Sequence, residues 1–96
     1  MKDEKNQTLH PVKGKINKRI SIDKYNFIRY NLLTILAKST LTHIDLMEAL
    51  YERVKENFDG GVQWYGEIVK LDLEARKLIE RTKDKPEKYK LVKPNR

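Results

Sequence analysis

Hydrophobic residues recur at intervals of three and four along three stretches of the chain, a spacing that places them on one face of a helix. The first stretch predicts a helix over residues 24–38, with Ser21 or Asp23 as its N-cap. The second begins at Thr42, which opens a capping-box pattern, and ends at the next pair of glycines. The third predicts a long helix over residues 62–81. The residues expected on the three buried faces are Tyr25, Ile28, Leu32, Ile35 and Leu36; Ile44, Met47, Leu50, Tyr51, Val54 and Phe58; and Trp64, Ile68, Leu71, Ala75, Leu78 and Ile79.

Shorter segments flank these helices. Alternating hydrophobic and polar residues over 16–22 predict an extended segment, and residues 81–92 read as a strand, a turn and a strand. Residues 1–13 are polar without periodicity and predict a flexible tail, so a single domain is expected over 14–93 with a C-terminal tail over 94–96. The predicted fold class is mainly α with a small β-hairpin: a three-helix winged helix-turn-helix domain with an N-terminal extended segment.

The composition narrows the classes of protein. A length of 96 residues fits one domain with a modest core, and completion of that core by a second copy, in a homodimer, is one expectation. The absence of cysteine excludes disulfides, cysteine-ligated zinc and thiol catalysis. The chain has no stretch near the roughly 18 apolar residues of a membrane span and starts without the apolar region of a secretory signal. We therefore expect a cytoplasmic protein without a membrane partner.

The basic residues gather at the two ends of the chain. The formal net charge is +7, of which residues 1–24 supply +4 and residues 82–96 another +4, while residues 25–81 are close to neutral. Basic ends of this kind attract phosphate groups. Lysine-rich ends that are only solvated are the alternative.

One run of residues resembles a known family. A Trp64-Tyr65 pair precedes the run Leu71-Asp72-Leu73-Glu74-Ala75-Arg76, and Ile79 stands before the predicted hairpin. This pattern resembles a small bacterial family of uncharacterised winged-helix proteins, and the likeness extends from His10 to Val92. The resemblance implies the fold and no assigned activity. More broadly, the run is similar to the recognition helix and wing of small bacterial regulators, which implies DNA binding and transcription regulation.

If the resemblance holds, the third helix enters the major groove of double-stranded DNA. Its polar face offers Gln63, Lys70 and Lys77 as contacts to base edges or phosphates. Glu67 and Glu74 lie on the same face and would meet the phosphates at a repulsive distance. Alternating charges at this spacing are also typical of an ordinary solvated helix, so both interpretations stay open.

The predicted hairpin is the second candidate contact, because a wing lies along the DNA backbone or minor groove. Its lysines are better placed for phosphates than those of the helix, although a lysine-rich hairpin also protects a sheet edge from aggregation. The candidate residues are Arg81, Lys83, Lys85, Lys88 and Lys90.

Asp72 and Arg76 fall inside the apolar arc of the third helix, although both are charged. Their spacing of four residues predicts a partly buried ion pair, and recognition of a partner subunit is the alternative. Trp64 and Tyr65 open the same helix, where Trp64 is expected in the core and stacking on a base is its alternative role.

An enzyme is not expected. His10 and His43 lack a carboxylate-rich neighbourhood and a metal-ligand spacing, so no cofactor, metal or small-molecule ligand is predicted. The sequence thus favours a DNA-binding winged-helix protein, and the alternative is a protein-interaction module on the same scaffold. An exposed apolar patch of Tyr65, Val69 and Leu73 would favour that alternative.

Overall fold

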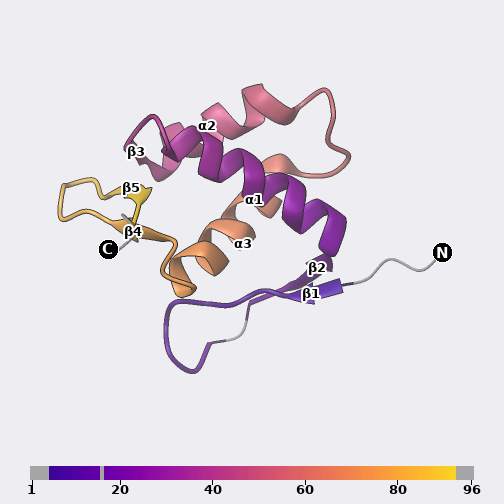
Figure 1. Cartoon of the computed structure of the whole chain (residues 1–96), viewed down its shortest axis with the longest axis horizontal. Coiled ribbons are helices and arrows are strands. Elements are labelled where there is room, and N and C mark those ends of the chain that lie inside the picture. Colours follow the sequence, from indigo (N-terminus) through magenta and orange to yellow (C-terminus); the bar gives the residue numbers. More distant parts are fainter. Residues whose placement is uncertain (1–4, 16, 93–96) are drawn as a thin grey trace.

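The computed structural model describes residues 5–15 and 17–92, which form three helices and two small antiparallel sheets (Figure 1). The helices are α1 (Ile22–Leu36), α2 (His43–Val54) and α3 (Val62–Ala75). The strands are β1 (Lys5–Gln7), β2 (Arg19–Ser21), β3 (Leu41–Thr42), β4 (Ile79–Arg81) and β5 (Lys88–Leu91). The predicted three helices and C-terminal hairpin are confirmed, whereas β1 and β3 are additional strands.

Side-chain caps fix where the first two helices begin. The Ser21 hydroxyl accepts a hydrogen bond from the Lys24 amide at 3.5 Å, so Ser21 is the N-cap of α1. The Thr42 hydroxyl accepts from the Asp45 amide at 3.2 Å and caps α2, as the capping-box pattern predicted. The end of α2 differs, because the helix stops at Val54, several residues before the glycine pair.

The third helix is shorter than predicted and ends at Ala75. Lys77 adopts a left-handed conformation with φ of 64°, and the Leu78 amide then donates back to the Leu73 carbonyl at 3.0 Å. This arrangement is the Schellman motif that closes many helices. It redirects the chain so that Ile79 enters β4 and is buried in the core instead of extending the helix.

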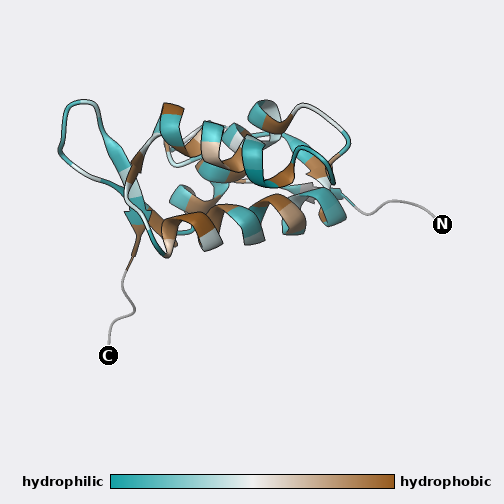
Figure 2. Ribbon diagram, turned by 90° about the horizontal axis from the view of Figure 1, so that it is seen from above, coloured by the Kyte–Doolittle hydropathy of each residue, from teal (hydrophilic) through white to brown (hydrophobic). Residues whose placement is uncertain are grey.

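The core lies where α3 packs against α1 and α2, and a three-stranded sheet with the order β3-β5-β4 closes one end. In Figure 2, hydrophobic positions alternate with hydrophilic ones along every helix, as expected for helices that bury one side. The second sheet, β1-β2, lies beside α1. The buried core residues are Ile20, Tyr25, Ile28, Leu32, Leu36, Leu46, Met47, Leu50, Val54, Val62, Ile68, Val69, Leu73, Ile79 and Tyr89.

The prediction that Trp64 belongs to the core is wrong, because 51% of its surface is exposed. The most buried line of α3 passes through Gly66, which the sequence placed on the polar face. A Cβ atom added at Gly66 would lie 2.7 Å from Leu50 Cδ2 and 2.9 Å from Met47 Sδ. The absence of a side chain at Gly66 therefore lets α2 approach α3 closely, and Trp64, two residues earlier, lies on the opposite side of α3.

The buried side of α2 is also displaced from the predicted one. Ile44 is 70% exposed and Tyr51 is 46% exposed, whereas Leu46 is fully buried. Leu46 and Leu50 are four residues apart and face the core together. Hydrophobic residues occur on more than one side of this helix, so spacing alone did not identify the buried side.

The prediction of a flexible tail is wrong for residues 5–13. Strand β1 pairs antiparallel with β2, with Lys5 opposite Ser21 and Gln7 opposite Arg19, and Thr8 is buried. Strand pairing supplies hydrogen-bond partners for the backbone amides and carbonyls of this polar segment. The segment can therefore pack in a defined position although it lacks hydrophobic periodicity. Residues 1–4, Ile16 and 93–96, the last of which include the predicted C-terminal tail, lie outside the described residues.

We expect Gly66→Ala to lower the free energy of unfolding by about 1 kcal/mol, because overpacking against the ends of the Leu50 and Met47 side chains exceeds the gain in helix propensity. Urea denaturation of the purified variant measures this change. The matched control is Gly61→Ala, whose added Cβ would lie at an ordinary 3.6 Å from Trp64 Cβ. Equal stability of the two variants would contradict the close approach at Gly66.

Candidate nucleic-acid interface

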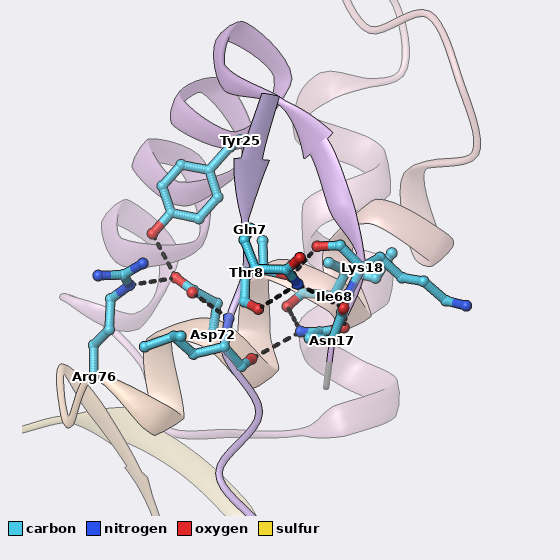
Figure 3. Close-up of polar contacts among 9 residues, drawn as sticks. Gln7, Thr8, Asn17, Lys18, Tyr25, Ile68, Asp72 and Arg76 are labelled. Atoms are coloured by element: carbon cyan, nitrogen blue, oxygen red, sulfur yellow. Dashed lines mark hydrogen bonds and ion pairs between the residues drawn. The ribbon is translucent and has the colours of Figure 1, made fainter. Parts of the chain in front are cut away.

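A buried carboxylate joins three parts of the chain. Asp72 on α3 has no exposed surface, and its two oxygens accept hydrogen bonds from the Leu9 amide at 2.8 Å, the Tyr25 hydroxyl at 2.5 Å and Arg76 Nε at 2.9 Å (Figure 3). Burial and the hydrogen bond to Asp72 raise the pKa of Tyr25 above its ordinary value. The predicted ion pair of Asp72 and Arg76 is confirmed, and it is one part of this four-residue group, the Asp72 cluster.

The Asp72 cluster helps to hold an N-terminal hairpin, formed by β1, β2 and the residues between them, against α3. Asn17 donates its side-chain amide to the carbonyls of Leu9 and Ile68, at 2.9 and 3.0 Å. The Thr8 hydroxyl donates to the Lys18 carbonyl at 2.5 Å and closes the hairpin from inside (Figure 3). The polar side chains of this segment are thus used for internal hydrogen bonds.

This hairpin is a basic surface, which the sequence interpretation divided between a flexible tail over residues 1–13 and an extended segment over 16–22. Residues 5–22 contain five basic and no acidic residues. The four basic residues that follow β1 are exposed. The signal was present in the sequence as an acid-free stretch. The basic residues are Lys5, Lys13, Lys15, Lys18 and Arg19.

The outward face of α3 offers little positive charge. Gln63 and Glu67 are exposed as predicted, but Lys70 is only 4% exposed, so its predicted role as a surface contact is wrong. The Lys70 ammonium lies 4.0 Å from the centre of the Tyr89 ring. Burial, with the nearby charge of Arg81 as a smaller cause, lowers the pKa of Lys70 to about 8.

The remaining basic residue predicted on this face, Lys77, lies beyond the helix. Its left-handed conformation after Ala75 places it in the turn that leads into β4, where its side chain is exposed. Lys77 therefore cannot act as part of a continuous helical face. Lys70 is the single basic residue within α3 itself.

Two of the predicted hairpin contacts are engaged with acidic neighbours. Arg81 donates to Glu74 at 2.5 Å and to Glu87 at 3.1 Å, and the hydrogen bond to Glu74 is the main cause of its raised pKa. Lys90 forms an ion pair with Glu80 at 3.6 Å across the two strands. These contacts stabilise the β4–β5 hairpin and reduce the charge that it presents to a ligand.

The loop between β4 and β5 carries the freer charges. Lys83, Lys85 and Lys88 are exposed, and the structure shows no ion pair for them among the described residues. Thr82 shapes the loop, because its hydroxyl accepts from the amides of Asp84 and Lys88 at 3.3 and 3.1 Å. This loop, hydrophilic in Figure 2, projects away from the helices.

The two helices that would form a helix-turn-helix pair are acidic. Residues 43–75 contain eight acidic and three basic residues, a net charge of −5, whereas residues 5–22 carry +5. Lys70 is one of those three basic residues and is buried. Positive charge suited to a polyanion therefore lies on the N-terminal hairpin and the β4–β5 loop and not on α2 and α3.

Other classes of site find little support in the described part of the chain. His43 Nδ1 is buried without a hydrogen-bond partner there, and burial lowers the pKa of this imidazole. No cluster of three or more potential metal-ligating side chains occurs in residues 5–15 and 17–92. Within the same ranges, no helix combines the length and hydrophobicity that crossing a membrane requires.

These features define a compact domain of three helices with a small three-stranded antiparallel sheet and a polar cluster that anchors an N-terminal hairpin. The chain belongs to a family of unknown function (DUF6958), whose model matches residues 5–89. No curated protein and no solved structure matches the chain. The expected likeness to a family without assigned function is thereby confirmed, and the match includes the N-terminal hairpin and the Asp72 cluster.

We expect Tyr25→Phe to destabilise the protein by about 1–3 kcal/mol, because the buried Asp72 carboxylate loses one of its three donors. The free energy of unfolding in urea measures the loss. Tyr30→Phe is the matched control, since the Tyr30 ring is 65% exposed. A Tyr25→Phe variant as stable as Tyr30→Phe would show that the carboxylate does not depend on this donor.

We expect Lys70→Met to stabilise the protein at pH 7 by on the order of 2 kcal/mol, because it removes a buried charge. The pKa of Lys70 falls from 10.5 to about 8 on folding, so between these values the unfolded chain binds more protons and wild-type stability rises with pH. Lys70→Met should remove that rise, and Lys38→Met should not. Urea denaturation from pH 7 to about pH 10.5 tests both points, and a variant less stable than the wild type at pH 7 would refute the first.

Proposed function

We propose that this protein binds double-stranded DNA through the phosphate backbone, on a winged helix-turn-helix scaffold. The order of elements supports the scaffold: a short strand, β3, lies between α1 and α2, and a hairpin follows α3. The sheet order β3-β5-β4 brings that short strand beside the second strand of the hairpin. In this assignment α2 and α3 are the helix-turn-helix pair and the β4–β5 loop is the wing.

The observation that carries the proposal is the set of exposed wing lysines without acidic partners in the described structure. Lys83 and Lys85 in the loop and Lys88 at the start of β5 present three ammonium groups from one internally hydrogen-bonded end of the hairpin. A polyanion gains affinity mainly by releasing its counterions when such groups approach its phosphates. The basic N-terminal hairpin, with five positive charges and no negative one in residues 5–22, supplies a second contact of the same kind.

The proposal assigns α3 a smaller role than a recognition helix usually has. The −5 charge of residues 43–75 opposes close approach to phosphates, and Lys70 is buried. Gln63, exposed in the first turn of α3, is the remaining predicted side chain suited to a base edge. We therefore expect backbone-led binding with weak preference for sequence.

A protein-interaction module is the second candidate function. Its predicted mark, an exposed patch of Tyr65, Val69 and Leu73, is not present, because Val69 and Leu73 are fully buried. The exposed Trp64 ring is the observation in its favour, since exposed tryptophan is enriched at protein interfaces. One exposed ring supports a contact surface less strongly than three unpaired lysines support a phosphate contact.

The test is a fluorescence-anisotropy titration of mixed-sequence duplex DNA at several salt concentrations. For the wild type we expect affinity that falls steeply as salt rises. In the variant Lys83→Glu/Lys85→Glu the slope of log affinity against log salt should decrease by about 2, because roughly one released counterion is lost for each phosphate contact.

The matched control is Lys38→Glu/Lys55→Glu, which changes the net charge by the same amount. Both lysines are exposed and lie outside the N-terminal hairpin and the β4–β5 loop. This control should keep most of the wild-type slope. Absence of binding at low salt, or equal loss in the two double variants, would refute the proposed contact.

A further inference from the structure

A shallow depression with a volume of about 340 Å³ lies between the first turns of α1 and the end of α3. Four of its lining residues stand at helical spacing on one side of α1, and the fifth is the arginine of the Asp72 cluster. The lining residues are Ile22, Tyr25, Asn26, Arg29 and Arg76. None of them is acidic, and two carry guanidinium groups.

The guanidinium of Arg76 is held in place by the buried Asp72 carboxylate. Its Nε donates to Asp72 Oδ2 at 2.9 Å, and Asp72 is itself fixed by Tyr25 and the Leu9 amide. In Figure 3 the Arg76 guanidinium lies beside the Asp72 carboxylate and the Tyr25 hydroxyl, and no interaction is drawn to its two terminal nitrogens. An arginine restrained in this way loses little side-chain entropy when it binds a ligand.

Arg29 supplies the second guanidinium. It is partly buried at the depression, and the structure shows no ion pair for it among the described residues. The neighbouring acidic group, Asp72, is fully buried and directs its oxygens to its own three donors. Arg29 therefore adds a positive charge with no ion-pair partner among the described residues, next to an Arg76 whose charge is partly balanced by Asp72.

We infer that this depression binds a phosphoryl group between Arg29 and Arg76. Planar guanidinium groups donate paired hydrogen bonds to the oxygens of phosphate, and Arg29 supplies a charge that no described carboxylate pairs. The Asn26 side-chain amide lines the same site and offers a further donor. The volume exceeds that of phosphate alone, so part of an attached organic group fits beside Ile22. This inference does not rest on the proposed DNA contact of the wing.

The probe is inorganic phosphate, titrated into the folded protein at constant ionic strength with chloride as the compensating anion. Nitrogen–proton NMR spectra of the arginine Nε groups report each guanidinium separately. We expect saturable shifts for Arg29 and Arg76 at millimolar phosphate, as suits an open site, and smaller shifts for other arginines.

Arg29→Gln should weaken phosphate binding about tenfold, because one charge-assisted pair is lost while the Asp72 cluster stays intact. Arg19→Gln is the matched control, since Arg19 is exposed on β2 and does not line the depression. A backbone amide spectrum like that of the wild type shows that each variant is folded. Absence of saturable shifts at Arg29 and Arg76, or equal weakening by Arg19→Gln, would overturn the inference.

The variant Arg29→Gln also identifies the source of the phosphoryl group. If Arg29→Gln also lowers affinity for duplex DNA, the site holds a backbone phosphate; if DNA affinity is unchanged while phosphate affinity falls, the site holds a small phosphorylated molecule. Both results support the site. Unchanged DNA binding in the wing variant Lys83→Glu/Lys85→Glu, with the phosphate shifts retained, would refute the wing proposal without affecting this one.

Discussion

The whole arrangement depends on one carboxylate that has no contact with solvent. A buried charge is tolerated only when hydrogen-bond donors and an opposite charge replace the water it has lost. Asp72 obtains these from a backbone amide of the N-terminal hairpin, a tyrosine of α1 and an arginine one turn further along α3. The positions of the hairpin and both helices are consequently coupled through a single side chain, and the two exposed features with functional interest, Arg76 and the basic hairpin, take their places from it.

Local patterns in the sequence predicted the local features. The caps at Ser21 and Thr42 and the Asp72–Arg76 pair each involve residues within one turn of each other, so spacing alone identifies them. The features that were missed involve distant partners or a competition between elements. Leu9 meets Asp72 across 63 residues of sequence, and α3 stops early because its last apolar residues are needed in the sheet.

The candidate DNA contacts also divide into those that the local sequence predicted and those that depend on distant partners. Exposure of the β4–β5 lysines follows from a polar turn and was predictable from composition. The burial of Lys70 and the ion pairs of Arg81 were not predictable from the sequence. They depend on Tyr89 and Glu87, which only the folded hairpin brings near α3. A helical wheel also cannot show that a glycine marks the tightest contact, as Gly66 does, and this is why Trp64 was placed on the wrong side.

The long separation between Leu9 and Asp72 also bears on the order in which the structure assembles. Closing so long a loop costs conformational entropy. This cost is offset only when α3 has formed and presents its carboxylate. On the ribosome the N-terminal hairpin is synthesised well before α3. The N-terminal hairpin must therefore wait for its contact with Asp72 until α3 has been made.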